Sequence, residues 1–311
     1  MSSQRSFAVA TRLATATSVL MFALIIIGSI VRTTGSGLAC PDWPLCHGQL
    51  IPPMQFNIFI EWFHRLIALF VGLLLFWTAG WVFTHRETRA RYGGLAALSV
   101  ALYFSQALLG ALTVWKLLDP SVVAGHLAMA LLLFCTLVTL AVASHRDGRD
   151  GAAEQGGSCP SGLLPLLGFT TALVYAQAVL GGMVSTNHAS LACPDWPRCN
   201  GEWFPPFEGL VALQVSHRLL AYALTLVVVV ASFMAGRAED TTVRYIGRLL
   251  PRLVLLQIAI GVANVFLGIP VWVSAVHLGN AALILALSLI ATLRVAAMPA
   301  ASPALAGVPA R

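Results

Sequence analysis

The chain has 311 residues, of which 58% are hydrophobic and only 10% are charged. A soluble domain carries roughly a quarter charged residues, so this composition places the chain among membrane proteins. The net charge of +6 could indicate a nucleic-acid partner. However, the sequence contains neither a glycine-rich phosphate loop nor a basic stripe with interleaved aromatic residues, and we expect no nucleic-acid partner.

Eight apolar segments are long enough to cross a bilayer as helices, which takes about 20 residues each. In chain order they cover residues 13–31, 57–83, 93–115, 121–143, 163–184, 210–235, 249–268 and 271–293. None shows the alternating pattern of a membrane barrel, so the sequence predicts an all-α membrane protein. The first segment is too long for a signal peptide and lacks a cleavage site, and no Arg/Ser-rich transit segment precedes it. These features favour a bacterial inner membrane.

Basic residues predict the orientation of the helices. The residues on one side are Arg5, Arg12, Arg86, Arg89, Arg91, Arg146, Arg149, Arg237, Arg244, Arg248, Arg294 and Arg311. The opposite side has only Arg32, Lys116 and Arg198. Because cytoplasmic loops are enriched in Lys and Arg, both termini should be cytoplasmic, and the loops at 32–56 and 185–209 should face outward.

The sequence contains an internal repeat. Residues 28–53 read GSIVRTTGSGLACPDWPLCHGQLIPP, and residues 181–206 read GGMVSTNHASLACPDWPRCNGEWFPP, at an offset of 153. The offset continues from His64 to His217, and a similar offset of 151 relates His126 to His277. Such self-similarity indicates a duplication.

The repeat divides the chain into two tandem four-helix bundles. We expect an N-terminal half at 1–143, a cytoplasmic linker at 144–162, a C-terminal half at 163–294 and a cytoplasmic tail at 295–311. Four helices is an even number, so both halves have the same orientation. They should be related by a pseudo-two-fold axis along the membrane normal.

Four of the eight histidines lie in predicted spans, namely His64, His126, His217 and His277. An isolated intramembrane histidine can simply bond to a neighbouring helix. Four at repeat-related positions, all near the outer end of a helix, favour a functional role. Two per half match the two axial ligands of a six-coordinate haem iron in a bundle core. Zinc would need three or four protein ligands, and neither CxxC nor HxxxH spacing occurs.

Glu61 is the clearest difference between the halves. It lies three residues before His64 on the same helix face, whereas its repeat counterpart is Gln214, which cannot ionise. A carboxylate at the membrane boundary can be hydrated and inert. An acid beside one histidine pair and an amide beside the other instead suggest proton-coupled chemistry in the first half and a redox cofactor in the second.

Several other residues near the outer surface each have two candidate roles. Arg65 and Arg218 follow the histidines and could extend towards lipid headgroups or bind haem propionates. The outward pairs Cys40/Cys46 and Cys193/Cys199 could form structural disulfides or take part in thiol–disulfide chemistry. Within the spans, Gln106, Gln177 and Gln257 each precede a glycine by four residues, and we expect them to form hydrogen bonds between closely packed helices.

The chain resembles the haem A synthase family of membrane enzymes, which oxidise haem O to haem A for terminal oxidases. The motifs that carry the resemblance are GSGLACPDWPLCHG at 35–48, EWFHR at 61–65, GHL at 125–127, SHR at 216–218 and VHL at 276–278. It extends over about residues 13–294, nearly the whole chain.

The resemblance implies an oxidoreductase that hydroxylates the C8 methyl group of haem O in successive steps, giving a hydrate that loses water to leave a formyl group. It implies that His64 and His126 bind the substrate haem beside Glu61, whereas His217 and His277 bind a haem b cofactor. It matches Cys40 and Cys46 to the family's outward cysteine pair. Partners expected besides haem O and membrane lipid are the farnesyltransferase that makes haem O and a membrane electron donor, and the sequence is compatible with a homo-oligomer.

A competing interpretation is a di-haem b-type protein that transfers electrons without oxidising its own haem. Four histidines in helical bundles would look alike there. The Glu61/Gln214 difference and the placement of all four histidines near one side of the membrane favour the enzyme. An electron carrier that crosses the membrane would more naturally hold its haems at different depths.

Overall fold

The computed structural model describes residues 3–148 and 158–298. Within these ranges the chain is helical without a β-strand, and eight helices are long and apolar enough to cross a membrane. These are α1 (Ser3–Thr33), α2 (Phe56–Thr84), α3 (Arg86–Trp115), α4 (Pro120–Gly148), α5 (Leu163–Thr186), α6 (Gly209–Ala235), α7 (Thr241–Phe266) and α8 (Val271–Ala296). The all-α membrane fold with eight spans is confirmed.

Several helices extend beyond the apolar segments read from the sequence. For example, α1 begins at Ser3 rather than at residue 13, and α4 continues to Gly148 rather than ending at 143. Hydropathy marks only the apolar part of a helix, whereas backbone hydrogen bonding continues through polar turns of good helix formers. The linker predicted at 144–162 therefore starts only after Gly148, and the tail predicted at 295–311 starts only after Ala296. Their remaining parts at 149–157 and 299–311, with Arg149 and Arg311, lie outside the described residues.

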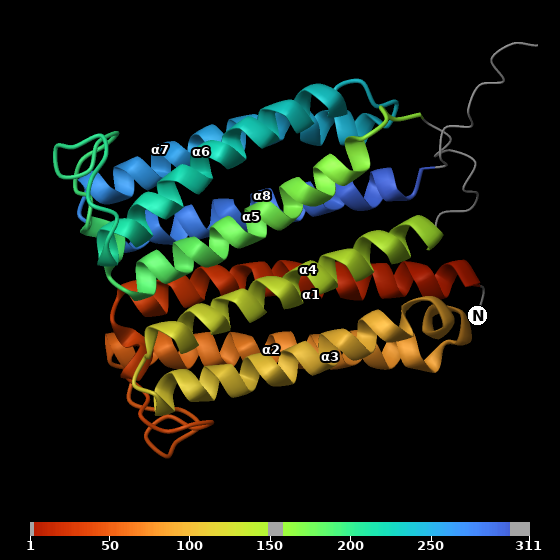
Figure 1. Ribbon diagram of the computed structural model, residues 1–311. Coiled ribbons are helices and arrows are strands. Elements are labelled where there is room, and N and C mark those ends of the chain that lie inside the picture. Colours follow the sequence, from red (N-terminus) through yellow and green to blue (C-terminus); the bar gives the residue numbers. More distant parts are fainter. Residues whose placement is uncertain (1–2, 149–157, 299–311) are drawn as a thin grey trace, which may run out of the picture.

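The helices form two layers, α1–α4 and α5–α8, that pack side by side (Figure 1). Each of α1 and α4 contacts α8, and α4 also contacts α5. Large fully buried side chains fill this junction, including Leu131 and Leu137 of α4, Leu167 of α5 and Leu285 of α8. One apolar core therefore joins the two halves.

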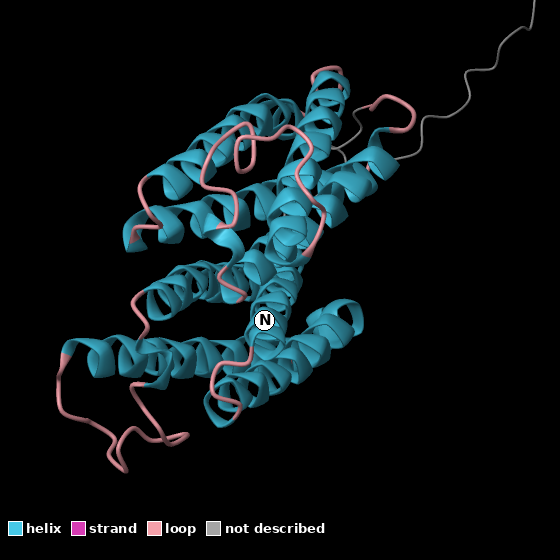
Figure 2. Cartoon of the chain, turned by 60° about the vertical axis from the view of Figure 1, so that its left-hand side comes forward, coloured by secondary structure: helices cyan, strands magenta, loops and turns pink. Residues whose placement is uncertain are grey.

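The two long loops, 34–55 and 187–208, leave the same end of the helical array, and the N-terminus lies at the other end (Figure 1). A view from another side shows helices and loops and no strand in the described part of the chain (Figure 2). Each long loop begins with a short 3-10 helix, η1 (Ser36–Leu38) or η3 (Ala189–Leu191). The two repeat motifs thus both lie in loops at this end of the helical array.

Candidate functional site

The four intramembrane histidines line one cavity of about 1100 Å³ that reaches into both halves. His64 and His217 are the ninth residues of α2 and α6, and His126 and His277 are the seventh residues of α4 and α8. Matching positions in the helices give the rings matching depths. The structure therefore brings together both predicted histidine pairs around a shared space.

Each of the four rings lies against a glycine of the preceding helix. A Cβ added at Gly28 or Gly110 would lie 3.3 or 3.2 Å from Cε1 of His64 or His126. At Gly181 or Gly261 the corresponding distance to His217 or His277 would be 2.9 or 3.0 Å. Because real Cβ contacts are rarely this short, a larger residue at any of these positions would require the histidine ring to shift, most of all at Gly181. Three of these glycines are the ones that follow Gln106, Gln177 and Gln257 by four residues in the sequence, whereas Gly28 is identified only by the structure.

Three glutamines contact the histidines, which confirms the expected hydrogen bonds between helices. Nε2 of Gln106 lies 3.2 Å from Nε2 of His126, and Nε2 of Gln177 lies 3.1 Å from Nδ1 of His217. Gln257 donates instead to the backbone oxygen of His277 over 3.0 Å. Each glutamine stands one turn before the glycine that supports the same ring.

Glu61 is buried at the edge of the cavity, with 6% of its surface exposed. Its carboxylate accepts a hydrogen bond from Nε of Arg65 over 2.8 Å. Burying a carboxylate is costly unless it is paired, and this ion pair meets that need. Glu61 therefore places an ionisable carboxyl group, paired with Arg65, on the cavity lining one helical turn from His64.

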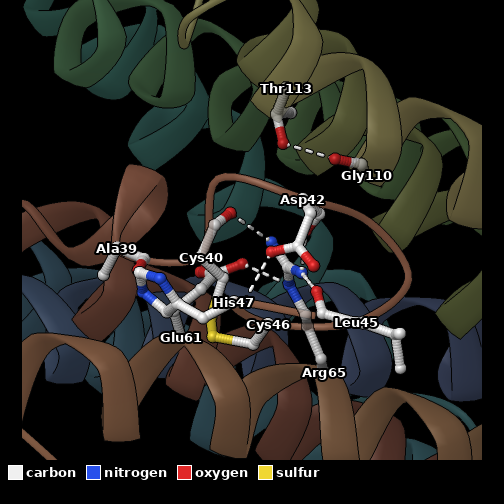
Figure 3. A network of polar contacts seen from close by, with 10 residues as sticks. All are labelled: Ala39, Cys40, Asp42, Leu45, Cys46, His47, Glu61, Arg65, Gly110 and Thr113. Carbon is white, nitrogen blue, oxygen red and sulfur yellow. Dashed lines mark hydrogen bonds and ion pairs between the residues drawn. A yellow bond between two sulfur atoms is a disulfide. The ribbon is translucent and has the colours of Figure 1, made fainter. Parts of the chain in front are cut away.

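The same Arg65 side chain binds the outer loop (Figure 3). Nη1 donates to the carbonyl oxygens of Asp42 and Leu45, each over 2.6 Å, and Nη2 donates to that of Cys40 over 3.0 Å. Arg218 repeats this in the second half, with the carbonyls of Asp195, Arg198 and Cys193 at 3.0, 2.9 and 2.7 Å. Both guanidinium groups thus hold a loop, a role that sequence reasoning missed.

Disulfides and a carboxylate complete each loop. Cys40 is bonded to Cys46 and Cys193 to Cys199, and all four cysteines are buried. Asp42 accepts hydrogen bonds from the backbone amides of His47 and Gly48 over 2.6 and 2.8 Å. These amides, with Gly48 the larger cause, lower the pKa of the Asp42 carboxyl.

Arg32 joins the two halves at the cavity. Its Nη1 donates to the carbonyl oxygen of Ser185 on α5 over 2.9 Å, and both residues line the cavity. From the sequence, Arg32 counted only as a charge on the outer side. Its repeat partner is Ser185 itself, so the two positions related by the duplication meet at the junction.

The site fits a haem iron better than a zinc ion. Among the described residues, no group of three or more His, Cys, Asp or Glu could hold a metal ion. Buried Nδ1 atoms of His64, His126 and His277 have no hydrogen-bond partner. The two pairs of imidazoles line one large, mostly apolar cavity, which is the setting that axial haem ligation requires.

Comparison with known proteins identifies the family. A family model described as "Cytochrome oxidase assembly protein" matches residues 11–289. The chain belongs to this family. A heme A synthase of Halalkalibacterium halodurans is 30% identical over 277 residues, which cover 85% of this chain and 89% of that protein.

Two further relatives of this cytochrome oxidase assembly family bear the same name. The heme A synthase of Shewanella oneidensis is 28% identical over 86% of this chain and 91% of its own length. That of Bacillus licheniformis is 31% identical over 80% of this chain and 84% of its own length. The family match over residues 11–289 includes both halves of the chain.

Proposed function

We propose that this membrane protein is a haem A synthase, an oxidoreductase that converts the C8 methyl group of haem O to a formyl group. The observation that carries the proposal is that two pairs of histidines line one cavity, in a chain whose relatives are heme A synthases. Those relatives do not support the alternative of a di-haem electron carrier.

The two halves take different roles in this proposal. His64 and His126 hold the iron of haem O, which is the substrate. His217 and His277 hold haem b, which supplies one-electron transfer when bound. Support for the division comes from Glu61, since the first half alone has a carboxylate at the cavity edge and the second half has Gln214 there.

In the first half, Glu61 serves as the proton acceptor. Oxidation of a methyl group removes hydrogen from carbon, and a nearby carboxylate can take up the released proton. Arg65 holds the carboxylate in place through the 2.8 Å hydrogen bond, so Glu61 keeps a fixed position beside His64. The remaining N–H groups of Arg65 and Arg218 leave propionate binding as a second role for these residues.

The apolar lining of the cavity keeps the reaction away from water. Leu66, Leu69 and Val71 of α2 line it beside the first histidine pair, together with Leu127 and Leu133 of α4. A low-dielectric environment strengthens the interaction between Glu61 and its surroundings. A porphyrin with a farnesyl-derived tail is also compatible with such a surface.

We also propose a membrane location and partners for the protein. The protein lies in a bacterial inner membrane with both termini in the cytoplasm, which the distribution of Arg supports. It receives haem O from the farnesyltransferase that makes it and exchanges electrons with a membrane donor. Direct hand-over would suit a substrate as hydrophobic as haem O.

Extraction and mass analysis of the haems from purified protein test the proposal. In a host that makes haem O, we expect haem A together with haem b. In a matched host without haem O, the same preparation should contain haem b alone. Haem b with unconverted haem O in the first host would contradict the synthase and leave an electron carrier.

A further inference from the structure

The amide side chains around the histidines differ between the halves. In the second half, Gln177 of α5 lies 3.1 Å from Nδ1 of His217, and it also donates to the backbone oxygen of His217 over 3.0 Å. The repeat counterpart of Gln177 is Leu24 of α1. Leu24 has no polar atom in its side chain, and Nδ1 of His64 is buried without a partner.

A second amide, Asn280, also has no equivalent in the first half. Its Nδ2 donates to Oε1 of Gln257 over 2.8 Å and to the carbonyl oxygen of Leu253 over 3.0 Å. Held in this way, Gln257 directs its own amide nitrogen at the backbone oxygen of His277 over 3.0 Å. Among the described residues, therefore, no side-chain amide forms a hydrogen bond with a ring nitrogen of His277.

The first half has Met129 at the position of Asn280. Its glutamine, Gln106, is not held, and its buried Oε1 has no partner. The amide nitrogen of Gln106 lies 3.2 Å from Nε2 of His126. Because an amide nitrogen can only donate, this hydrogen bond occupies the lone pair of Nε2, and that nitrogen cannot bind iron at the same time.

These contacts predict unequal iron ligation in the two halves. A histidine that binds metal through one ring nitrogen normally donates a hydrogen bond from the N–H of the other, so its supporting group must be an acceptor. In the structure Gln177 presents its amide nitrogen to Nδ1 of His217, and its own buried Oε1 has no partner. Turning this amide over would give Nδ1–H the acceptor Oε1 in exchange for the bond to the backbone oxygen, whereas Leu24 can provide no acceptor for His64. In addition, iron must displace Gln106 to reach His126, but nothing comparable blocks His277.

We infer that Gln177 and Asn280 are positioning residues that make the C-terminal half retain its haem, while Leu24 and Met129 make the N-terminal half an exchangeable site. This inference rests on the proposed function, because only a synthase needs one permanent haem and one that leaves as product. These four residues determine which half retains its haem and which half exchanges it. None of the four takes part in the chemistry.

Two substitutions, Gln177→Leu and Asn280→Met, introduce the residue types of the first half at the equivalent positions of the second. We expect each to weaken haem b binding roughly 10- to 100-fold, which is the usual effect of removing a group that supports a metal ligand. The measurement is the rate at which purified protein loses haem b to an excess of a haem-binding acceptor protein. The low-spin absorption spectrum of bis-histidine haem reports the ligation independently of activity.

Thr171→Val is the matched control. Thr171 of α5 forms a hydrogen bond of 3.0 Å with Thr292 of α8, so its loss also removes a polar contact between helices of the second half. Neither threonine lines the cavity. We expect this variant to release haem b at the unmodified rate, which separates an effect on ligation from an effect on packing.

The reverse exchange, Leu24→Gln with Met129→Asn, should slow the loss of haem from the first half. Purified protein should then rise from about one towards about two retained haems per chain. The inference is overturned if Gln177→Leu and Asn280→Met release haem b as slowly as Thr171→Val. If the unmodified protein instead binds no haem b, the proposed function itself fails, and the two failures are distinct.

Discussion

Arg65 donates a hydrogen bond to Glu61 over 2.8 Å while its other nitrogens bind three carbonyl groups of the outer disulfide loop. One side chain therefore connects the carboxylate at the cavity to the outer loop, which also contributes residues to the cavity lining. In the second half Arg218 keeps the loop contacts, but Gln214 donates to the carbonyl oxygen of Ser190 over 3.3 Å. The loop can thus be held without the carboxylate.

Glu61→Gln should reduce haem A production by roughly 100-fold or more, because general acid–base groups contribute on this scale. The second half shows that an amide at this position is compatible with a folded loop, so the variant should remain stable. Haem extraction from membranes measures the product. Full haem A production by Glu61→Gln would remove the proton-transfer role. Haem b content provides the control and should not change.

Arg218→Lys should loosen the second outer loop. A lysine ammonium is a compact charge and cannot span three carbonyl groups as the planar guanidinium does. We expect a loss of about 2 kcal/mol in the free energy of unfolding, since hydrogen bonds to charged groups are strong. Hydrogen exchange of residues 193–201 should accelerate. Unchanged exchange there would show that the three bonds do not hold the loop.

Gly181→Ala should displace the ring of His217, because the added Cβ would lie 2.9 Å from Cε1. The expected result is loss of the low-spin haem b spectrum with little change in the amount of protein inserted in the membrane. Gly168→Ala on the same helix is the control, since a Cβ there meets nothing within 4 Å. Equal spectra for both variants would contradict the role of Gly181 in seating the ring.

The outer loops should lose order in acid. Amide hydrogen bonds lower the pKa of Asp42 and Asp195 in the folded protein, so these carboxylates stabilise the loops above the unfolded pKa of about 4. That stabilisation disappears as the pH falls through the folded pKa. Hydrogen exchange of residues 40–49 at pH 7 and pH 3 measures it. At pH 7, Asp42→Asn should accelerate hydrogen exchange in the first loop by part of the amount that acid does. It should leave exchange in the second loop unchanged.

Sequence patterns were sufficient for the overall architecture. Hydropathy located all eight spans because the length and polarity of a membrane helix are local properties of the chain. The duplication related His64 to His217 without any structure, since repeated motifs preserve their spacing. The division into spans and loops, the cysteine pairs and the candidate histidines therefore required only the amino-acid sequence.

Tertiary structure decided which side chains meet. The sequence left Arg65 between lipid headgroups and haem propionates, whereas the folded chain places its guanidinium among loop carbonyls. It also brings Arg32 to Ser185, and Asn280 to Gln257. Hydropathy does not specify how a lipid-facing helix is rotated or which helix is its neighbour, because every apolar face is equally soluble in hydrocarbon. Close packing between helices distant in the sequence determines both, and with them the chemistry available at the cavity.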